Sequence, residues 1–244
     1  DWERIVNLLA AQKPLWEPGT ESGYHAVTFG YLLGEVLRRI TGKTLGTFFR
    51  EEVAEPLGAD FHIGLDEKHD SRVAELIPPA PLLSEYLVLD PESELGKAMA
   101  NAPRLPECTR DRAWRSAEIP ASNGHGNARS VARVGSVLAC GGEVDGIRLL
   151  GNETIEKAIE EQHYGKDLVL GVPIRWGLGF GLTSADRPVG PNPRTCYWGG
   201  WGGSAIIMDL DAKLSFAYVM NKMASGTLGD GRLLGPAMAL FSAL

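Results

Sequence analysis

The sequence predicts a mixed α/β protein of the α+β kind, with an antiparallel sheet flanked by helices. Apolar residues recur at helical spacing in several segments of the first 175 residues, whereas from Trp176 onward they recur at every second position. Helices followed by consecutive strands and a final helix are typical of antiparallel α+β proteins rather than of doubly wound parallel sheets. We therefore divide the chain into a mostly helical, loop-rich part (1–175) and a part made of antiparallel strands and a C-terminal helix (176–244).

The helices are predicted from apolar stripes bounded by capping residues. Thr44 is the N-cap candidate of one helix and Asn127 that of another, because a short polar side chain accepts a hydrogen bond from the first helical turn. Gly42 is expected to end the helix before Thr44, since glycine adopts the left-handed C-cap conformation without strain. Helices are therefore expected at about 27–41, from 44 to a break at 56–58, and at about 91–101, 128–140, 153–162 and 231–244.

Strands are predicted toward the C-terminus from alternating apolar residues bounded by glycine and proline. The last two are joined by residues 210–213, which have the length of a hairpin loop. Trp176, at the start of the first strand, is expected to pack in the core. The strands are expected at 176–182, 195–198, 204–209 and 214–220.

Composition and charge exclude several classes of function. The formal net charge is −7 and no lysine or arginine cluster offsets it, so neither nucleic acid nor a membrane surface is an expected partner. The 3 cysteines lack C-x-x-C spacing and the 5 histidines lack an H-E-x-x-H pattern, so no metal and no other cofactor is expected. Cysteine usage that fits a reducing compartment, with no signal peptide and no long apolar run, favours a cytoplasmic protein.

Three segments carry the functional information. The first reads W-E-P-G-T-E-S-G-Y-H-A over residues 16–26 and places Tyr24 just before a predicted helix. The second reads S-N-G-H-G-N-A-R-S-V-A-R over residues 122–133, and the third reads Y-W-G-G-W-G-G-S over residues 197–204. In this order they resemble the serine hydrolases of the β-lactamase and penicillin-recognising superfamily. Within it, the chain looks most like the class-C-related carboxylesterases called family VIII.

The resemblance implies roles for individual residues. Tyr24 matches the tyrosine that such enzymes bring to the site, and the W-G-G triplet matches the one that lines the site from an inner strand. The N–H of Trp201 would be one donor of an oxyanion hole, with the nucleophile's own N–H as the other. For the two residues of the 122–133 loop, packing within the loop is the alternative to a substrate contact. The implied substrate-binding residues are Trp198, Gly199, Gly200, Asn123 and His125.

The chemistry of such a site explains these residue types. A phenol, with a pKa of about 10, is a poor base at neutral pH, so Tyr24 needs a neighbouring ammonium group or a proton shared with a lysine. Glycine after a tryptophan on a strand allows a substrate to approach the backbone closely. Trp198 stands where β-lactamases carry lysine. Loss of that positive charge disfavours the carboxylate of a β-lactam or a D-Ala-D-Ala peptide and favours a small uncharged ester.

The family's nucleophile is missing from these 244 residues. Family members attack with the serine of an S-x-x-K motif, and no serine here has a lysine three positions later. Ala26, where β-lactamases carry asparagine after the tyrosine, is a second departure. We therefore expect the C-terminal portion of an esterase, completed by a preceding segment or a second chain. An isolated chain of this kind should expose a sheet edge and an apolar face.

Three hypotheses remain open at this point. In the first, the chain is part of a serine carboxylesterase that cleaves small uncharged esters through an acyl-serine intermediate. In the second, it is a binding module or pseudoenzyme that keeps the cleft without a nucleophile. The third, a relative of β-lactamases or D-Ala-D-Ala peptidases, is disfavoured by Trp198 and Ala26. Ester hydrolysis, together with an S-x-x-K motif encoded upstream, distinguishes the first from the second.

Overall fold

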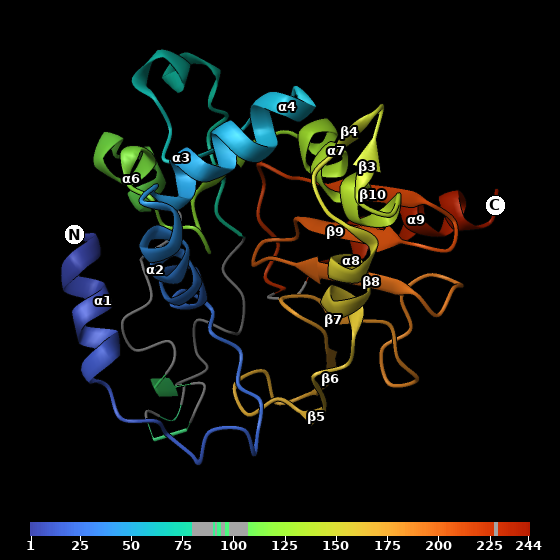
Figure 1. Ribbon diagram of the computed structural model, residues 1–244, viewed down its shortest axis with the longest axis horizontal. Helices are drawn as coiled ribbons and strands as arrows, with labels where there is room; N and C mark the ends of the chain where they lie inside the picture. Colours follow the sequence, from blue (N-terminus) through green and yellow to red (C-terminus); the bar gives the residue numbers. More distant parts are fainter. Residues whose placement is uncertain (80–89, 91, 94–95, 98–106, 227–228) are drawn as a thin grey trace.

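A computed structural model describes residues 1–79, 90, 92–93, 96–97, 107–226 and 229–244. It shows a mixed α/β architecture in which helices flank an antiparallel sheet, as the sequence predicts (Figure 1). The helix predicted at about 91–101 lies mostly outside the described residues. Among the helices that the structure describes, none has the length and apolar character needed to cross a membrane.

The other predicted helices are present, and their ends follow the predicted caps. Thr44 accepts a hydrogen bond from the N–H of Thr47, and Asn127 accepts one from the N–H of Ser130. Gly42 ends the preceding helix in the left-handed conformation, with a φ of 74°. The N-terminal helix is an addition to the predicted set. The helices are α1 (Trp2–Ala11), α2 (Phe29–Thr41), α3 (Leu45–Phe49), α4 (Glu55–Leu57), α6 (Arg112–Ser116), α7 (Ala128–Ala139), α8 (Asn152–Ile159) and α9 (Gly231–Phe241).

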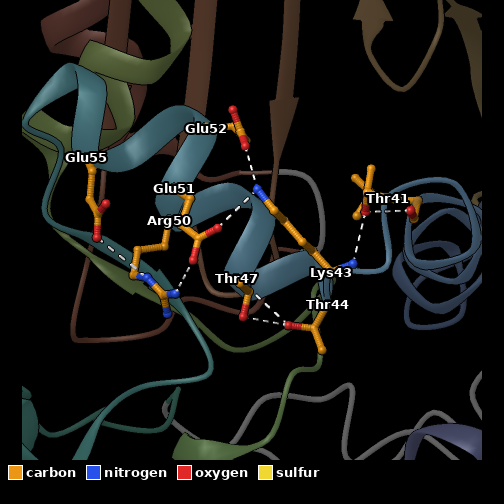
Figure 2. A network of polar contacts seen from close by, with 9 residues as sticks. Thr41, Lys43, Thr44, Thr47, Arg50, Glu51, Glu52 and Glu55 are labelled. Carbon is orange, nitrogen blue, oxygen red and sulfur yellow. Dashed lines mark hydrogen bonds and ion pairs between the residues drawn. The ribbon is translucent and has the colours of Figure 1, made fainter.

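The segment between Thr44 and the break at 56–58 is helical throughout, because a π-helical turn (Arg50–Ala54) links α3 to α4. Figure 2 shows the charged network on its surface. Lys43 Nζ contacts the carboxylates of Glu52 at 2.6 Å and Glu51 at 3.1 Å, and Arg50 contacts Glu51 at 2.8 Å. The pairs are exposed to solvent, so they contribute little to the stability of the fold.

The main sheet contains six antiparallel strands in the order β10-β9-β8-β7-β6-β5. The predicted hairpin at 210–213 joins β9 to β10. The sheet begins earlier than the alternation of apolar residues predicts, and the predicted strand 176–182 is interrupted by a turn. Gly179 lies in that turn with a φ of 84°, a conformation that few other residues adopt. The strands are β5 (His163–Lys166), β6 (Pro173–Trp176), β7 (Gly181–Leu182), β8 (Thr195–Gly199), β9 (Ala205–Asp209) and β10 (Leu214–Tyr218).

Two small antiparallel sheets are absent from the sequence-based prediction. One pairs β1 (Phe61–Ile63) with β2 (Gly124–Gly126), and the other pairs β3 (Glu143–Val144) with β4 (Ile147–Arg148). These strands have two or three residues each, too few for an alternating pattern to be recognised. The first sheet also joins segments that are far apart in the sequence.

Helices cover both faces of the main sheet. Successive residues of β8 point to opposite faces: Cys196 packs toward α7 and α8, whereas Tyr197 packs with Ala237 of α9. In β9, Met208 and Ile207 divide in the same way. The core on the α7 and α8 side is formed by Leu138, Ala139, Ile155, Leu182, Cys196, Met208 and Leu210.

The helix α2 has two contrasting faces. One packs on α1, where the indole N–H of Trp2 donates to Glu35 at 2.9 Å and its ring lies 4.9 Å from that of Tyr31. A separate stripe at helical spacing is made of large apolar side chains that are exposed by 44–78%. It consists of Phe29, Leu33, Val36 and Ile40.

Candidate active site

Tyr24 is held at the sheet by a buried aspartate. Its main-chain N–H donates to Asp167 Oδ1 at 3.0 Å, although the two residues are 143 positions apart. Asp167 directly follows β5 and is fully buried, and the same oxygen accepts hydrogen bonds from the N–H groups of Val169 and Leu170 at 3.0 and 2.9 Å. The segment that leads into α2 is therefore tied to the turn between β5 and β6.

The side chain of Tyr24 lies against two tryptophans. The ring of Trp198 is 5.1 Å away and that of Trp176 is 6.3 Å away and nearly parallel, and the two indoles are 4.8 Å apart. The indole N–H of Trp198 donates to the hydroxyl oxygen of Tyr24 at 3.3 Å. This hydrogen bond fixes the position of the Tyr24 hydroxyl relative to the indole of Trp198.

The glycine-rich turn after β8 presents one main-chain donor. The N–H groups of Gly200, Gly202 and Gly203 donate to carbonyl oxygens at 2.7, 3.0 and 3.1 Å, respectively. Within the part of the chain that the structure describes, the N–H of Trp201 has no acceptor. Trp201 is 41% exposed, whereas Gly202 and Gly203 are buried. The N–H group that is expected to serve as an oxyanion donor is thus not engaged by another described residue.

The glycines of the W-G-G triplet have different surroundings. Gly199 is a buried residue at the end of β8, paired with Ala205 of β9. A Cβ atom at Gly200 would meet only the carbonyl oxygen of Ser204, at an ordinary distance of 3.8 Å, and Gly200 does not have a positive φ. Among the described residues, neither crowding nor backbone strain requires glycine at this position. Space for a substrate is an alternative reason.

The side-chain amide of Asn123 is hydrogen-bonded to main-chain groups of its own loop. Its side chain is buried, and its amide oxygen accepts the N–H of Ile119 at 2.9 Å. Its amide nitrogen donates to the carbonyl oxygens of Trp114 and Ala117 at 2.8 and 2.6 Å. These bonds close the loop before β2. The polar atoms of Asn123 are thus engaged with the main chain, which is the packing alternative.

His125 lies in the small sheet, where it pairs with His62 of β1. Burial lowers the pKa of His125, and its Nδ1 atom is buried without a partner among the described residues. No hydrogen bond or ring contact between described residues joins His125 or Asn123 to Tyr24 or Trp198. In the same ranges, no group of three or more histidine, cysteine, aspartate or glutamate side chains is arranged to hold a metal ion.

The order of these elements along the chain matches a known family. Residues 1–235 match the family model described as Beta-lactamase. The chain belongs to the beta-lactamase family. The predicted relationship to β-lactamase-like and penicillin-binding-protein-like hydrolases is thereby confirmed, and so is the predicted fold.

Solved structures and a curated relative support the same assignment. A family VIII carboxylesterase is 42% identical with a TM-score of 0.91, and a penicillin-binding protein homologue from Caulobacter crescentus is 39% identical with a TM-score of 0.88. Each match covers 100% of this chain and 64% of the other. The Esterase/beta-lactamase LipL of Mycobacterium tuberculosis (strain ATCC 25618 / H37Rv) is 33% identical over 215 residues, which are 84% of this chain and 49% of LipL. This beta-lactamase-family chain therefore spans about half the length of the curated relative.

Two residues of the site are not among those that the sequence predicts. Trp176 was expected in the core, but it is only half-buried and its ring contacts Tyr24 and Trp198. Asp167 was not singled out. Its position before a tight turn is a local signal for side-chain hydrogen bonding, but its bond to Tyr24 has no local signal.

Proposed function

We propose that this chain forms part of the active site of a serine carboxylesterase that acts on small uncharged esters. The nucleophilic serine and its lysine belong to a segment of the natural protein outside these 244 residues, or to a second chain. The observation that carries the proposal is the hydrogen bond from the Trp198 indole to the Tyr24 hydroxyl. It brings together the two residues that the family pattern assigns to catalysis and substrate binding. The names of two similar proteins, a carboxylesterase and an esterase/beta-lactamase, support it further.

The reaction uses Tyr24 as a proton carrier. With the lysine of the S-x-x-K motif beside Tyr24, the serine hydroxyl transfers its proton to the tyrosine oxygen, and the serine oxygen bonds to the ester carbonyl carbon. The carbonyl oxygen becomes an oxyanion, which accepts hydrogen bonds from the Trp201 N–H and from the N–H of the nucleophile. The C–O bond to the alcohol then breaks, and the departing alkoxide takes the proton from Tyr24. Water repeats these steps on the acyl-serine and releases the carboxylic acid.

The aromatic side chains account for the class of substrate. Trp198 donates one neutral N–H where a lysine would place a full positive charge, so nothing in this triplet neutralises a substrate carboxylate. Trp176 enlarges the apolar wall next to Tyr24. An ester with an apolar acyl or alcohol group fits such a wall better than a charged β-lactam or peptide does. Ala26 lacks the amide group that β-lactamases have at this position, which also favours an ester over a β-lactam.

The proposal is tested on the natural polypeptide that contains this chain. The wild-type protein should hydrolyse p-nitrophenyl butyrate, and Tyr24→Phe should lower kcat by about 10²–10³-fold because the proton carrier is lost. Tyr164→Phe is the matched control: this tyrosine is 43% exposed and donates to Asp186, so its loss should leave kcat unchanged. An alkyl fluorophosphonate should label a serine followed three positions later by a lysine.

The outcomes separate the hypotheses. A wild-type protein that neither hydrolyses the ester nor reacts with the fluorophosphonate would support the binding module without a nucleophile. Hydrolysis of a β-lactam with a kcat/KM above that for the ester would support the β-lactamase relative. Equal kcat values for wild type and Tyr24→Phe would remove Tyr24 from the mechanism.

A further inference from the structure

The turn that presents the Trp201 N–H is held from outside by a charged pair. Arg232, in the first turn of α9, donates from one Nη to the carbonyl oxygen of Gly202 at 3.0 Å and from the other to that of Lys222 at 2.8 Å. Its Nε atom donates to both carboxylate oxygens of Asp230, at 3.0 and 2.9 Å. The Asp230 side chain is only 9% exposed, and its hydrogen bonds from Arg232 hold its pKa below the usual value.

The turn depends on this support because its own backbone is permissive. Gly202 and Gly203 have φ values of 94° and 122°, and glycine loses more conformational freedom on ordering than any other residue. The carbonyl oxygen of Gly202 receives a second donor, the N–H of Ala224 at 2.8 Å. A Cβ atom at Gly203 would collide with the Asp230 carboxylate, so the pair also packs directly against the turn.

We propose that Arg232 is a positioning residue for hydrolysis: with Asp230, it fixes the peptide after Gly202 so that the Trp201 N–H points at the developing oxyanion. This role rests on the proposed esterase reaction. Arg232 acts through the turn and touches neither the substrate nor the reacting atoms. Its planar guanidinium can bind two carbonyl oxygens and a carboxylate at once, which a lysine ammonium cannot reproduce in the same geometry.

The kinetic test compares Arg232→Met and Arg232→Lys with the wild-type natural polypeptide. Because a misplaced oxyanion donor weakens binding of the transition state more than that of the substrate, Arg232→Met should lower kcat for p-nitrophenyl butyrate by about 10–100-fold with little change in KM. Arg232→Lys should restore part of the loss. The control is Arg194→Met, which removes ion pairs to Glu156 and Asp211 near the start of β8 and should leave kcat unchanged.

A transition-state analogue separates positioning from a general loss of stability. With phenylboronic acid, the serine oxygen bonds to boron, the serine proton passes to the base, and one boron hydroxyl occupies the oxyanion hole. The inhibition constant should rise in Arg232→Met by the same factor by which kcat falls. A fall in kcat with an unchanged inhibition constant would contradict the positioning role.

Amide hydrogen exchange gives a readout that does not depend on esterase activity. Peptides that span residues 199–204 should exchange at least about tenfold faster in Arg232→Met than in wild type, and at the wild-type rate in Arg194→Met. If the wild-type protein hydrolyses no ester, the proposed function fails and this comparison alone decides whether Arg232 fixes the turn. Wild-type exchange together with wild-type kcat in Arg232→Met would overturn the inference.

Discussion

Two buried aspartates build similar turns at two places on the main sheet, with different consequences. Asp167 and Asp209 are both fully buried. Each directs one carboxylate oxygen at two N–H groups a few residues downstream, at distances between 2.9 and 3.1 Å. The second oxygen of Asp209 accepts the side-chain amide of Asn192 at 2.9 Å. The second oxygen of Asp167 is buried and has no partner among the described residues, while its first oxygen also holds Tyr24.

The two aspartates differ in how far away their hydrogen-bond partners lie in the sequence. All partners of Asp209 lie within 17 positions of it, and they complete its hydrogen bonding at the β9–β10 hairpin. Asp167 Oδ1 accepts a hydrogen bond from Tyr24, which is 143 positions away, and Oδ2 has no partner among the described residues. Incomplete hydrogen bonding of a buried group is costly, so it is uncommon in native proteins. The hydrogen bond to Tyr24 connects the Asp167 turn, unlike the Asp209 turn, to the candidate site.

The largest expected effect comes from replacing each of the two aspartates with alanine. Asp167→Ala leaves three N–H groups without their acceptor, so it should destabilise the protein by about 3 kcal/mol and, by releasing Tyr24, lower kcat for p-nitrophenyl butyrate about 100-fold. Asp209→Ala should cost a similar amount of stability and leave kcat unchanged. Urea unfolding and ester kinetics on both variants measure the two effects. An equally large loss of kcat in Asp209→Ala would contradict the expectation that only the Asp167 turn affects catalysis.

A smaller effect is expected from the other contact that orients Tyr24. Trp198→Phe removes the indole N–H that donates to the Tyr24 hydroxyl but keeps an aromatic ring in the wall. Because this bond orients the Tyr24 hydroxyl, its loss should lower kcat about 10-fold with little change in KM. Steady-state kinetics on the variant and the wild type would measure kcat and KM. An unchanged kcat would show that the main-chain hydrogen bond to Asp167 is enough to position Tyr24.

Replacement with asparagine should cost different amounts of stability at the two positions, with the larger loss at Asp209. In Asp167→Asn, the amide oxygen can still accept three N–H groups, and the amide nitrogen takes the place of an oxygen that has no partner. In Asp209→Asn, the new amide nitrogen faces the amide nitrogen of Asn192, and both are donors. Asp209→Asn should therefore cost about 1–2 kcal/mol of stability, and Asp167→Asn less than about 1 kcal/mol. Chemical denaturation of the two variants checks this order.

The smallest effect concerns a carboxylate that lies away from the site. Hydrogen bonds from Arg38, Arg39 and Trp2 lower the pKa of Glu35 from 4.5 to about 2. Since the folded pKa is the lower one, this stabilisation is present above pH 4.5 and is lost as the pH falls toward 2. Glu35→Gln should lower Tm by a few degrees at pH 7, and its difference from wild type should vanish near pH 2. The exposed Glu21→Gln is the control, and thermal unfolding across this range is the measurement.

Elements with local signals were predicted well, and elements that depend on distant partners were not. The caps Thr44 and Asn127 and the hairpin at 210–213 are formed by neighbouring residues, and all three are present. The strands β1 and β2 have three residues each and pair across a long stretch of chain. Residues before Trp176 join the main sheet without a recognisable alternation. Their pairing depends on partners that no local pattern specifies.

The sequence by itself determined where the segments that carry Tyr24 and the W-G-G triplet lie relative to the helices and strands. It placed Tyr24 just before α2 and the W-G-G triplet at the end of β8, because turn-forming and apolar residues specify those boundaries locally. Only the tertiary structure decided that Asp167 binds the main chain of Tyr24 and that Trp176 packs beside its ring. The same is true of the hydrogen bond from Arg232 to the carbonyl oxygen of Gly202. It also engaged the amide of Asn123 within its own loop. Hydrogen bonds between distant residues arise from how the sheet and helices pack, and such packing leaves no periodic pattern in the chain.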